Sequence, residues 1–346
     1  MEDVEHLIVG AGPAGLRAAQ VLAEAGREVL VLEKRPEIGP KTCAGGLTLK
    51  AMERLERLGL PRDVALRSVG HVAFTGCRAA ALDQELTVVY TLPRRQLGQY
   101  QLTWCRSAGA EVCAGVAVRE IDLEGRTVAC DGRRIRWRHL IGADGADSGV
   151  RRALHLPSPR AYFAAEYNIP GVQLEPLRVE CDPGALKNGY FWVFPHATYT
   201  SIGAVAPKHM VAPSALRRYL EGRLAGLDVS PAGAPFEGAT LEVEFRGFHF
   251  PGQVHLIGDA AGVASSLTAE GIYPALITGE DVARGLLEPS YLTLDTTSWL
   301  RVKRRHDRLA GLLSWRLGRA AAFPMLAALA WLPPIRRPMA EWFLAG

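Results

Sequence analysis

The stretch Leu7-Ile8-Val9-Gly10-Ala11-Gly12-Pro13-Ala14-Gly15 decides the fold. Its apolar run predicts a buried strand that ends at a glycine turn, and the Ala- and Leu-rich segment 14–24 predicts a helix that Gly26 ends. A second apolar run, Val29-Leu30-Val31-Leu32, predicts the next strand, with Glu33 at its end. Strand, glycine turn, helix, strand and acid in this order indicate the first crossover of a dinucleotide-binding lobe.

The residues of this turn have separate expected roles. Gly10 permits the tight turn, Gly12 lets the backbone approach a pyrophosphate, and Gly15 lets the helix pack close to the strand. The N-terminus of the helix offers free N–H groups to the phosphates. Because a carboxylate at Glu33 accepts ribose hydroxyls and repels a 2′-phosphate, the slot suits FAD or NAD and not NADP. The alternative is a cluster of turn glycines in an unrelated α/β protein.

Two later segments repeat the pattern of an apolar strand before a glycine-acid turn. They are Leu140-Ile141-Gly142-Ala143-Asp144-Gly145-Ala146-Asp147-Ser148 and Val254-His255-Leu256-Ile257-Gly258-Asp259-Ala260-Ala261-Gly262. Asp259 is expected to bond a ribityl hydroxyl, with a helix-capping role as the alternative. The helix that opens at 268–272 would place its N-terminus at the flavin N1–C2 edge, where negative charge gathers on reduction. Three such segments in this order predict a site for one flavin dinucleotide.

The rest of the chain differs from these segments in amino-acid composition and pattern. Residues 160–250 are rich in aromatic and β-branched residues and are broken by prolines, which suits an antiparallel sheet. From Ser298 onward the pattern is helical. For a chain of 346 residues we predict an α/β fold, α+β overall, in which a Rossmann-type FAD-binding lobe is interleaved with an antiparallel-sheet substrate lobe and followed by a C-terminal helical segment. The predicted ranges are 1–68, 94–155 and 251–295 for the FAD-binding lobe, 69–93 and 156–250 for the substrate lobe, and 296–346 for the helical segment.

Shorter elements are expected between these motifs. The periodicity predicts helices over 48–58 and 94–108, and strands over 69–75, 86–92, 111–118, 126–130 and 133–141. The last three of these strands are expected to return to the FAD-binding lobe.

The bulk composition argues against several classes of function. The net charge of +4, from 40 basic and 36 acidic side chains, is too mild to predict nucleic-acid binding. The six cysteines include no Cys-x-x-Cys pair, so no metal site is predicted. Because the first strand begins a few residues after Met1, we expect no signal peptide, and free thiols favour a cytoplasmic location. The apolar stretch 320–332 is cut by Pro324 and is too short to span a membrane.

The nucleotide motifs resemble those of the flavoprotein monooxygenase superfamily, whose fold pairs a Rossmann-type FAD lobe with a sheet-based substrate lobe. Gly142-Ala143-Asp144-Gly145, followed by Ser148 and Arg151-Arg152, is similar to the superfamily's middle motif. Arg94 matches the arginine that opens a helix and contacts FAD in such proteins.

Two further stretches resemble one branch of this superfamily, the geranylgeranyl reductase family. Lys41-Thr42-Cys43-Ala44-Gly45-Gly46-Leu47 resembles the family's Lys-x-Cys-Gly-Gly-Gly-Leu loop beside the flavin, with Ala44 in place of the first glycine. Tyr190-Phe191-Trp192-Val193-Phe194-Pro195, followed by Ser201-Ile202-Gly203, resembles its Tyr-x-Trp-x-Phe-Pro…Val-Gly signature. Members saturate carbon–carbon double bonds in isoprenoid chains of lipids, chlorophyll side chains or quinones. The resemblance ends near residue 290, and the segment after about residue 296 leaves the substrate open.

The motifs and the resemblance together define the predicted cofactor site. The resemblance implies FAD, with electrons from NAD(P)H, ferredoxin or quinol, since no second nucleotide motif or cluster site identifies the donor. The residues expected to bind FAD are Gly10, Gly12, Ala14, Gly15, Glu33, Lys34, Cys43, Ala44, Gly46, Arg94, Val118, Asp144, Gly145, Asp259, Gly271 and Ile272.

The substrate site is expected on the strand that carries the aromatic motif. Tyr190, Trp192 and Phe194 alternate, so their side chains share one face, which lines a channel for a prenyl chain or packs in an ordinary core. Cys43 is expected to donate a proton or to modulate the flavin, with a small buried hydrophobe as the alternative. His196 would act as an acid or bind a phosphate head group, unless it is structural. The predicted catalytic residues are Cys43, Tyr190 and Trp192, and the predicted substrate-binding residues are Tyr190, Trp192, Phe194 and His196.

These features predict an FAD-dependent oxidoreductase that reduces double bonds of a prenyl chain. The enzymatic alternative is a monooxygenase of the same fold that hydroxylates a small aromatic substrate, and the non-enzymatic alternative is a prenyl-binding escort protein. The basic segment from Arg301 to Arg308, with Trp331, Trp342 and Phe343, predicts peripheral contact with the inner face of a membrane. Its alternative is a solvated face over an ordinary helical subdomain.

Overall fold

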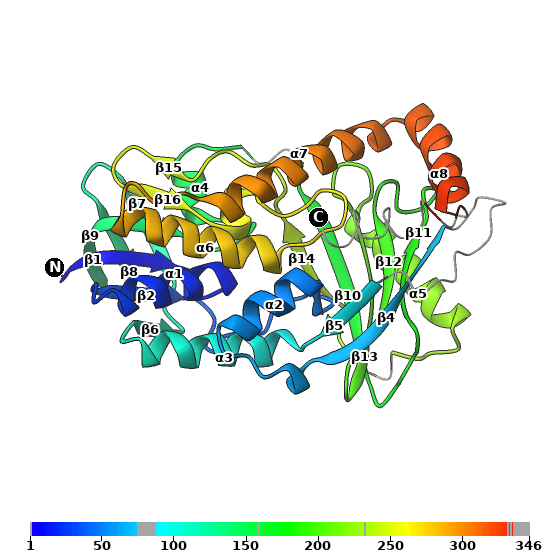
Figure 1. Cartoon of the computed structure of the whole chain (residues 1–346), viewed down its shortest axis with the longest axis horizontal. Coiled ribbons are helices and arrows are strands. Elements are labelled where there is room, and N and C mark those ends of the chain that lie inside the picture. Colours follow the sequence, from blue (N-terminus) through cyan, green and yellow to red (C-terminus); the bar gives the residue numbers. More distant parts are fainter. Residues whose placement is uncertain are drawn as a thin grey trace.

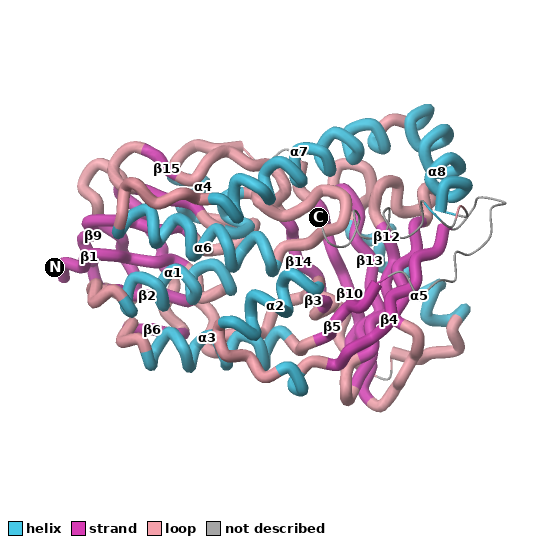
Figure 2. The backbone as a smooth tube through the Cα atoms, in the orientation of Figure 1, coloured by secondary structure: helices cyan, strands magenta, loops and turns pink. Residues whose placement is uncertain are grey.

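Two eight-stranded sheets form the framework of the protein in the computed structural model, which describes residues 2–74, 87–157, 160–231, 233–330, 332 and 334. The sheets stand at opposite ends of an elongated molecule, with helices along and between them (Figure 1 and Figure 2). This arrangement confirms the predicted α/β fold class. The residues Cys77, Trp331, Trp342 and Phe343 lie outside the described part of the chain.

The first sheet carries the predicted crossover. Its strands are β1 (Glu2–Val9), β2 (Val29–Glu33), β6 (Glu111–Ala114), β7 (Val118–Asp122), β8 (Thr127–Cys130), β9 (Arg133–Gly142), β15 (His249–Phe250) and β16 (Val254–Leu256). Parallel pairing joins them in the order β16-β9-β1-β2-β6, so the first strand of the chain lies at the centre. β15, β8 and β7 add antiparallel pairs. The three nucleotide motifs therefore follow β1, β9 and β16, which are neighbours in the sheet.

Three helices pack together beside this sheet. They are α1 (Pro13–Glu24), α3 (Arg94–Ser107) and α6 (Ile272–Leu287), and α1 contacts both of the others. α1 begins at Pro13, whose fixed φ suits the first helical position. Ala18 and Ala19 are fully buried in this helix, because small side chains let it lie close to its neighbours.

Two short helices begin at side-chain caps. α2 (Leu49–Arg57) follows Thr48, whose hydroxyl accepts a hydrogen bond from the Ala51 amide, and α4 (Gly149–Ala153) follows Ser148, which accepts one from the Arg151 amide. A 3-10 turn, η1 (Arg62–Val64), leads from α2 toward the second sheet, and another, η2 (Gly258–Ala261), forms the turn after β16.

The second sheet is almost wholly antiparallel, as expected for the substrate lobe. Its strands are β3 (Gly46–Leu47), β4 (Leu66–Phe74), β5 (Thr87–Thr91), β10 (Tyr162–Pro170), β11 (Leu177–Cys181), β12 (Tyr190–Pro195), β13 (Tyr199–Pro207) and β14 (Glu237–Leu241). They lie in the order β14-β10-β13-β12-β11-β4-β5-β3. Among the described strands of this sheet, the pair β4–β11 is parallel. The Cys43 loop reaches this sheet directly, because β3 follows it and pairs with β5.

Helix α5 (Pro213–Gly226) was not predicted from the sequence. It packs against β13 and β10 and buries Leu216, Leu220 and Leu224, which recur at a spacing of four residues. The prediction over 160–250 was wrong here because the aromatic and β-branched composition of the region outweighed this short helical pattern. Pro213 at the start of the helix was the missed signal.

The predicted strand over 111–118 was also wrong, because the structure divides it. β6 ends at Ala114 and β7 begins at Val118, with Gly115 between them at a φ of +80°. A left-handed glycine turns the chain, so β6 joins the parallel sheet while β7 pairs with β8.

The predicted C-terminal helical segment forms α7 (Leu294–Ser314) and α8 (Arg316–Ala330). α7 runs from the first sheet toward the second, and α8 bends sharply from the end of α7 and lies beside the second sheet (Figure 1). Pro324 was expected to cut the apolar stretch, but α8 continues through it, and the chain turns instead at Trp315, whose φ of −85° and ψ of 141° are extended. Across the described residues, none of the helices is both long enough and apolar enough to cross a bilayer.

Stacked histidines cross the centre of the first sheet. His6 and His139 are register partners on β1 and β9, with ring centroids 5.1 Å apart, and the His139 and His255 centroids are 5.6 Å apart. His255 Nδ1 lies 2.9 Å from His249 Nδ1. Burial lowers the pKa of His139 to about 4 and that of His255 to about 3, so both rings are neutral in the folded protein.

We predict that acid weakens this fold below pH 6.5. The unfolded chain protonates His255 at its ordinary pKa of about 6.5, whereas the folded chain resists until about pH 3, so the free energy of unfolding falls through this window. His255 alone would contribute about 1.4 kcal/mol per pH unit. Urea unfolding at pH 7.5 and 5.5 measures the slope, and His255→Gln should reduce it, whereas His209→Gln on the surface should not. An equal slope in both variants would contradict this origin.

Candidate functional site

A cavity of about 630 Å³ is lined by residues of both sheets and of the C-terminal helices. This volume lies within the range of small-molecule and cofactor pockets. Gly15 and His196 are the two predicted site residues that do not line it. The predicted residues that do are Gly10, Gly12, Ala14, Glu33, Lys34, Cys43, Ala44, Gly46, Arg94, Val118, Asp144, Gly145, Tyr190, Trp192, Phe194, Asp259, Gly271 and Ile272.

The glycine turn after β1 is shaped by close approaches. Gly10 has a φ of +103°, and a Cβ there would lie 2.4 Å from the Ala143 carbonyl oxygen. A Cβ at Gly15 would lie 2.0 Å from the Gly10 carbonyl oxygen, so Gly15 packs α1 against the turn and stays behind the cavity wall. Gly12 has open space around it and caps α1 without a side-chain hydrogen bond. The amides of the first helical turn are therefore free to meet an anionic group.

Glu33 is fixed at the end of β2 by two backbone amides. Its Oε2 accepts a hydrogen bond from the Ala11 amide at 2.9 Å, and its Oε1 accepts one from the Arg35 amide at 2.9 Å. A carboxylate has about four acceptor positions, so each oxygen retains capacity for a hydroxyl donor. The side chain is thus oriented beside the glycine turn, as a ribose acceptor requires.

Four residues of the cavity wall, Arg94, Gln101, Asp144 and Asn188, have a buried side-chain polar atom that lacks a partner within the described chain, and two of them belong to the predicted nucleotide site. Arg94, the first residue of α3, is 9% exposed, and its Nη1 has no hydrogen-bond partner among the described residues. Asp144 Oδ2 accepts bonds from the Gly149 and Val150 amides, but Oδ1 is likewise unpartnered there. Burial raises the pKa of Asp144. Because buried polar atoms are nearly always paired, these two fit a polar ligand such as FAD.

Asp259 and the start of α6 form another part of the wall. Lys41 Nζ lies 2.9 Å from Asp259 Oδ2, an ion pair that joins the Cys43 loop to the turn after β16. Gly271 caps α6 without a side-chain hydrogen bond, which leaves the positive end of the helix dipole open toward the cavity. No separate role was predicted for Lys41, although it lies within the Cys43 loop.

The position of His196 differs from the one expected for a substrate-binding residue. The side chain is 1% exposed, its Nε2 lies 2.9 Å from the Ala44 carbonyl oxygen, and its ring stacks on Tyr199 at 4.3 Å. Burial lowers its pKa. His196 therefore holds the Cys43 loop from behind, and its side chain is not part of the cavity lining.

A chain of hydrogen bonds links the Cys43 loop to the aromatic strand. The Cys43 amide donates to Glu166 Oε1 at 2.8 Å, and Ser201 donates to Glu166 Oε2 at 2.7 Å. Trp192 Nε1 donates to Ser201 Oγ at 2.9 Å. Burial raises the pKa of the Cys43 thiol, so the group is neutral near pH 7. The sequence did not identify Glu166; a charged residue inside an apolar strand was the available signal.

The aromatic motif on β12 has the alternation that the sequence predicted. Tyr190, Trp192 and Phe194 line the cavity, while Phe191 and Val193 are fully buried in the core that α5 covers. The Tyr190 hydroxyl donates to the Thr268 carbonyl at 2.8 Å, which ties the strand to the loop before α6. One face of β12 is therefore an apolar wall of the cavity that the nucleotide turns also line.

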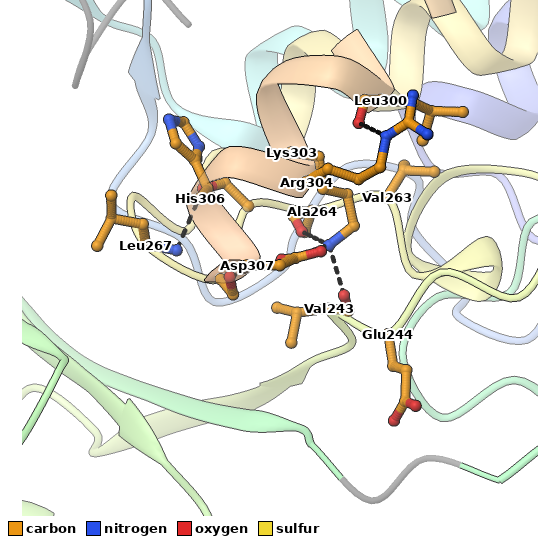
Figure 3. A network of polar contacts seen from close by, with 12 residues as sticks. Val243, Glu244, Val263, Ala264, Leu267, Leu300, Lys303, Arg304, His306 and Asp307 are labelled. Atoms are coloured by element: carbon orange, nitrogen blue, oxygen red, sulfur yellow. Dashed lines mark hydrogen bonds and ion pairs between the residues drawn. The ribbon is translucent and has the colours of Figure 1, made fainter. Parts of the chain in front are cut away.

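The C-terminal helices close part of the cavity, which the sequence did not predict. Leu313 of α7 and Phe323 and Leu326 of α8 belong to its lining. Lys303 anchors α7: it is 1% exposed, and its ammonium donates to the carbonyls of Val243 and Ala264 and contacts Asp307 Oδ1 at 3.1 Å (Figure 3). Lys303 was grouped with a basic surface segment, but it faces inward.

Sequence comparisons relate this chain to known proteins. The sequence profile of a family described as an FAD binding domain matches residues 3–218. A digeranylgeranylglycerophospholipid reductase of Methanopyrus kandleri is 31% identical over 88% of this chain and 86% of its own length.

Solved structures agree in fold. A geranylgeranyl bacteriochlorophyll reductase-like protein of Thermoplasma acidophilum has a TM-score of 0.72 and 20% identity over 99% of this chain and all of its own. A p-nitrophenol 4-monooxygenase of Pseudomonas putida has a TM-score of 0.72 and 19% identity over 99% of this chain and 98% of its own. At these identities the two structures support the shared fold alone.

Proposed function

Because this chain belongs to the geranylgeranyl reductase family of FAD-dependent oxidoreductases, we propose that it reduces carbon–carbon double bonds in the prenyl chain of a lipid. The observation that carries the proposal is that the glycine turn after β1 and the apolar aromatic wall line the same cavity. A lipid-borne prenyl chain is favoured because the M. kandleri relative is named for such a substrate.

The residues proposed to hold FAD divide by chemistry. The pyrophosphate is received by the N-terminal turn of α1, where Ala14 carries the first N–H because Pro13 has none. Glu33 receives the ribose hydroxyls, and Arg94 supplies a buried donor. Asp259 is proposed to accept a ribityl hydroxyl, with Lys41 orienting its carboxylate. When bound and reduced, FAD supplies a hydride to one carbon of the alkene.

The protein must position an alkene that no carbonyl polarises. Trp192 and Phe194 present apolar surface that orients the chain and keeps water away from the reacting bond. Tyr190 is held by its bond to Thr268, so its ring stays in the wall. We propose that Cys43, as a neutral thiol in the wall, packs against the flavin and modulates it.

Anaerobic single-turnover kinetics test the proposed function. Purified protein is reduced under nitrogen and mixed with a digeranylgeranylglycerophospholipid, and flavin reoxidation is followed by absorbance. Reoxidation by the lipid supports the reductase. A hydroperoxide intermediate in air with an aromatic acceptor, and no reaction with the lipid, supports the hydroxylase instead. Colourless protein that cannot be reconstituted with FAD supports the escort protein. Anaerobic reduction of the oxidised flavin, followed by absorbance, distinguishes NAD(P)H, ferredoxin and quinol as electron donors.

We also propose that the turn between α7 and α8 contacts a membrane surface. Arg301, Arg304, Arg305 and Arg308 are exposed along α7. Trp315 is 74% exposed and Leu317 is 82% exposed at the turn, near helices that line the cavity. Basic residues beside exposed apolar side chains suit an anionic bilayer. A prenyl lipid would then enter without crossing water.

Liposome flotation tests this contact. We expect the wild-type protein to float with anionic vesicles at low salt and to dissociate as salt rises, because the arginine contribution is screened. The double variant Trp315→Glu/Leu317→Glu should bind at least about tenfold more weakly, since apolar burial is replaced by repulsion. Leu292→Glu is the matched control, because Leu292 is 71% exposed but precedes α7. Failure of the wild type to float at low salt would end the proposal.

A further inference from the structure

Glu270 places a carboxyl group in the cavity wall that the proposed function does not yet use. It lies two residues before α6, and its side chain belongs to the cavity lining. The Thr48 hydroxyl, which caps α2, donates to Glu270 Oε1 at 2.7 Å. The Glu270 amide donates a hydrogen bond to Thr268 Oγ1 at 3.4 Å, and the Glu270 carbonyl accepts a hydrogen bond from the Ser265 amide at 3.0 Å. The carboxyl is therefore fixed between two helices.

This carboxyl stands beside one end of the aromatic wall. The bond from the Tyr190 hydroxyl to the Thr268 carbonyl joins β12 to the loop that carries Glu270. The charge of Glu270 contributes to raising the pKa of both Tyr190 and Tyr273, as expected for groups that lie close together. A prenyl chain lying along Tyr190 and Trp192 would therefore have this carboxyl within the same cavity.

We propose that Glu270 is the general acid that completes reduction of the double bond, an assignment that rests on the proposed function. A hydride forms a carbon–hydrogen bond at one alkene carbon. The π electron pair then forms a second carbon–hydrogen bond at the other alkene carbon, using the proton of the Glu270 carboxyl group, whose O–H bond breaks. The products are the saturated chain and the Glu270 carboxylate, which regains a proton from water before the next turnover. The two electrons of the hydride would come from reduced FAD, which would be oxidised in this step.

Acidity separates Glu270 from the other groups in the wall. Burial raises the pKa of Glu270 to about 7, against the opposing effects of the Thr48 hydrogen bond and the Lys50 charge. An acid whose pKa lies near the working pH is present in its protonated form and still releases the proton readily. Burial raises the already high pKa of Cys43 and of Tyr190, so both are weaker donors. Asp259 is paired with Lys41, and Glu166 is outside the lining. The pKa of Asp144 is also raised by burial, but its carboxylate accepts hydrogen bonds from the Gly149 and Val150 amides, which favour the charged form.

The first test compares holoenzyme variants in single turnover with a digeranylgeranylglycerophospholipid as the probe. Glu270→Gln keeps an oxygen acceptor for Thr48 but removes the acidic proton. We expect unchanged flavin content and a reoxidation rate roughly 10²- to 10⁴-fold lower, the usual contribution of a general acid. The wild-type rate should fall as pH rises above about 7, and this limb should disappear in Glu270→Gln. Glu270→Asp should restore part of the rate.

The second test does not depend on activity. Infrared spectra of the resting holoenzyme should contain a protonated-carboxyl band that disappears as pH rises through about 7. Glu270→Gln should lack this band, and Glu221→Gln on α5 should retain it. If the wild type reacts with the lipid and Glu270→Gln reacts equally fast, the assignment is overturned and the function stands. If the wild type does not react with the lipid, both the proposed reductase function and the role of Glu270 as its general acid are overturned, whatever the infrared band shows about the protonation of Glu270.

Discussion

Replacing Glu33 with Arg is expected to give a folded protein that purifies without flavin. The carboxylate holds the glycine turn by accepting a hydrogen bond from the Ala11 amide, and it is the proposed acceptor for the ribose hydroxyls. The substitution would remove the two hydrogen bonds from the ribose hydroxyls and place a bulky cation in the site. Bonds to a charged group contribute about 1.5–3 kcal/mol each, which corresponds to at least about 100-fold weaker binding of FAD.

The ratio of flavin to protein absorbance after gel filtration measures this loss. Glu53→Arg, an exposed position on α2 outside the cavity lining, is the control for the change of charge and should remain yellow. Circular dichroism verifies that Glu33→Arg is folded. Undiminished flavin in a folded Glu33→Arg protein would show that the nucleotide does not lie along β2.

Replacing Cys43 with Ala is expected to leave FAD bound while slowing prenyl reduction by roughly tenfold, or about 1.4 kcal/mol of transition-state stabilisation. The loop should keep its position, because Glu166 bonds the Cys43 backbone amide and His196 bonds the Ala44 carbonyl, and neither contact needs the thiol. The substitution removes the thiol from the cavity wall, together with its contact with the Gly45 amide at 3.4 Å.

The pH profile separates this effect from that of Glu270. Cys43→Ala should retain the decline of rate above about pH 7, because the proposed acid is intact. Cys43→Ser, which is nearly isosteric, should recover more of the rate than Cys43→Ala if packing against the flavin is the main role. Turnover equal to that of the wild type in Cys43→Ala would remove the thiol from the mechanism.

Local sequence patterns were sufficient for the nucleotide turns. Gly10, Gly15 and Glu33 are separated by one strand and one helix, so their spacing alone fixes their geometry. The alternation of Tyr190, Trp192 and Phe194 likewise predicted a shared face, since side chains along a strand alternate. These features depend on contacts within short segments.

Other parts of the site depend on contacts between distant segments. Glu166 and Glu270 become recognisable only when β10 meets the Cys43 loop and α6 meets α2. His196 adjoins the aromatic motif in sequence, but the structure turns it behind the loop. Lys303 lies in a basic run, and its burial depends on the carbonyls of Val243 and Ala264. No local periodicity contains this information.

The closure of the cavity by α8 has a consequence for how such proteins diversify. The nucleotide turns and the proposed acid come from residues before α6, whereas Phe323 and Leu326 come from the last described helix. Mutations in α8 can lengthen, shorten or reshape the compartment for a hydrocarbon tail while the residues of the nucleotide site stay unchanged. Selection on tail length and selection on electron transfer can thus proceed independently in one polypeptide.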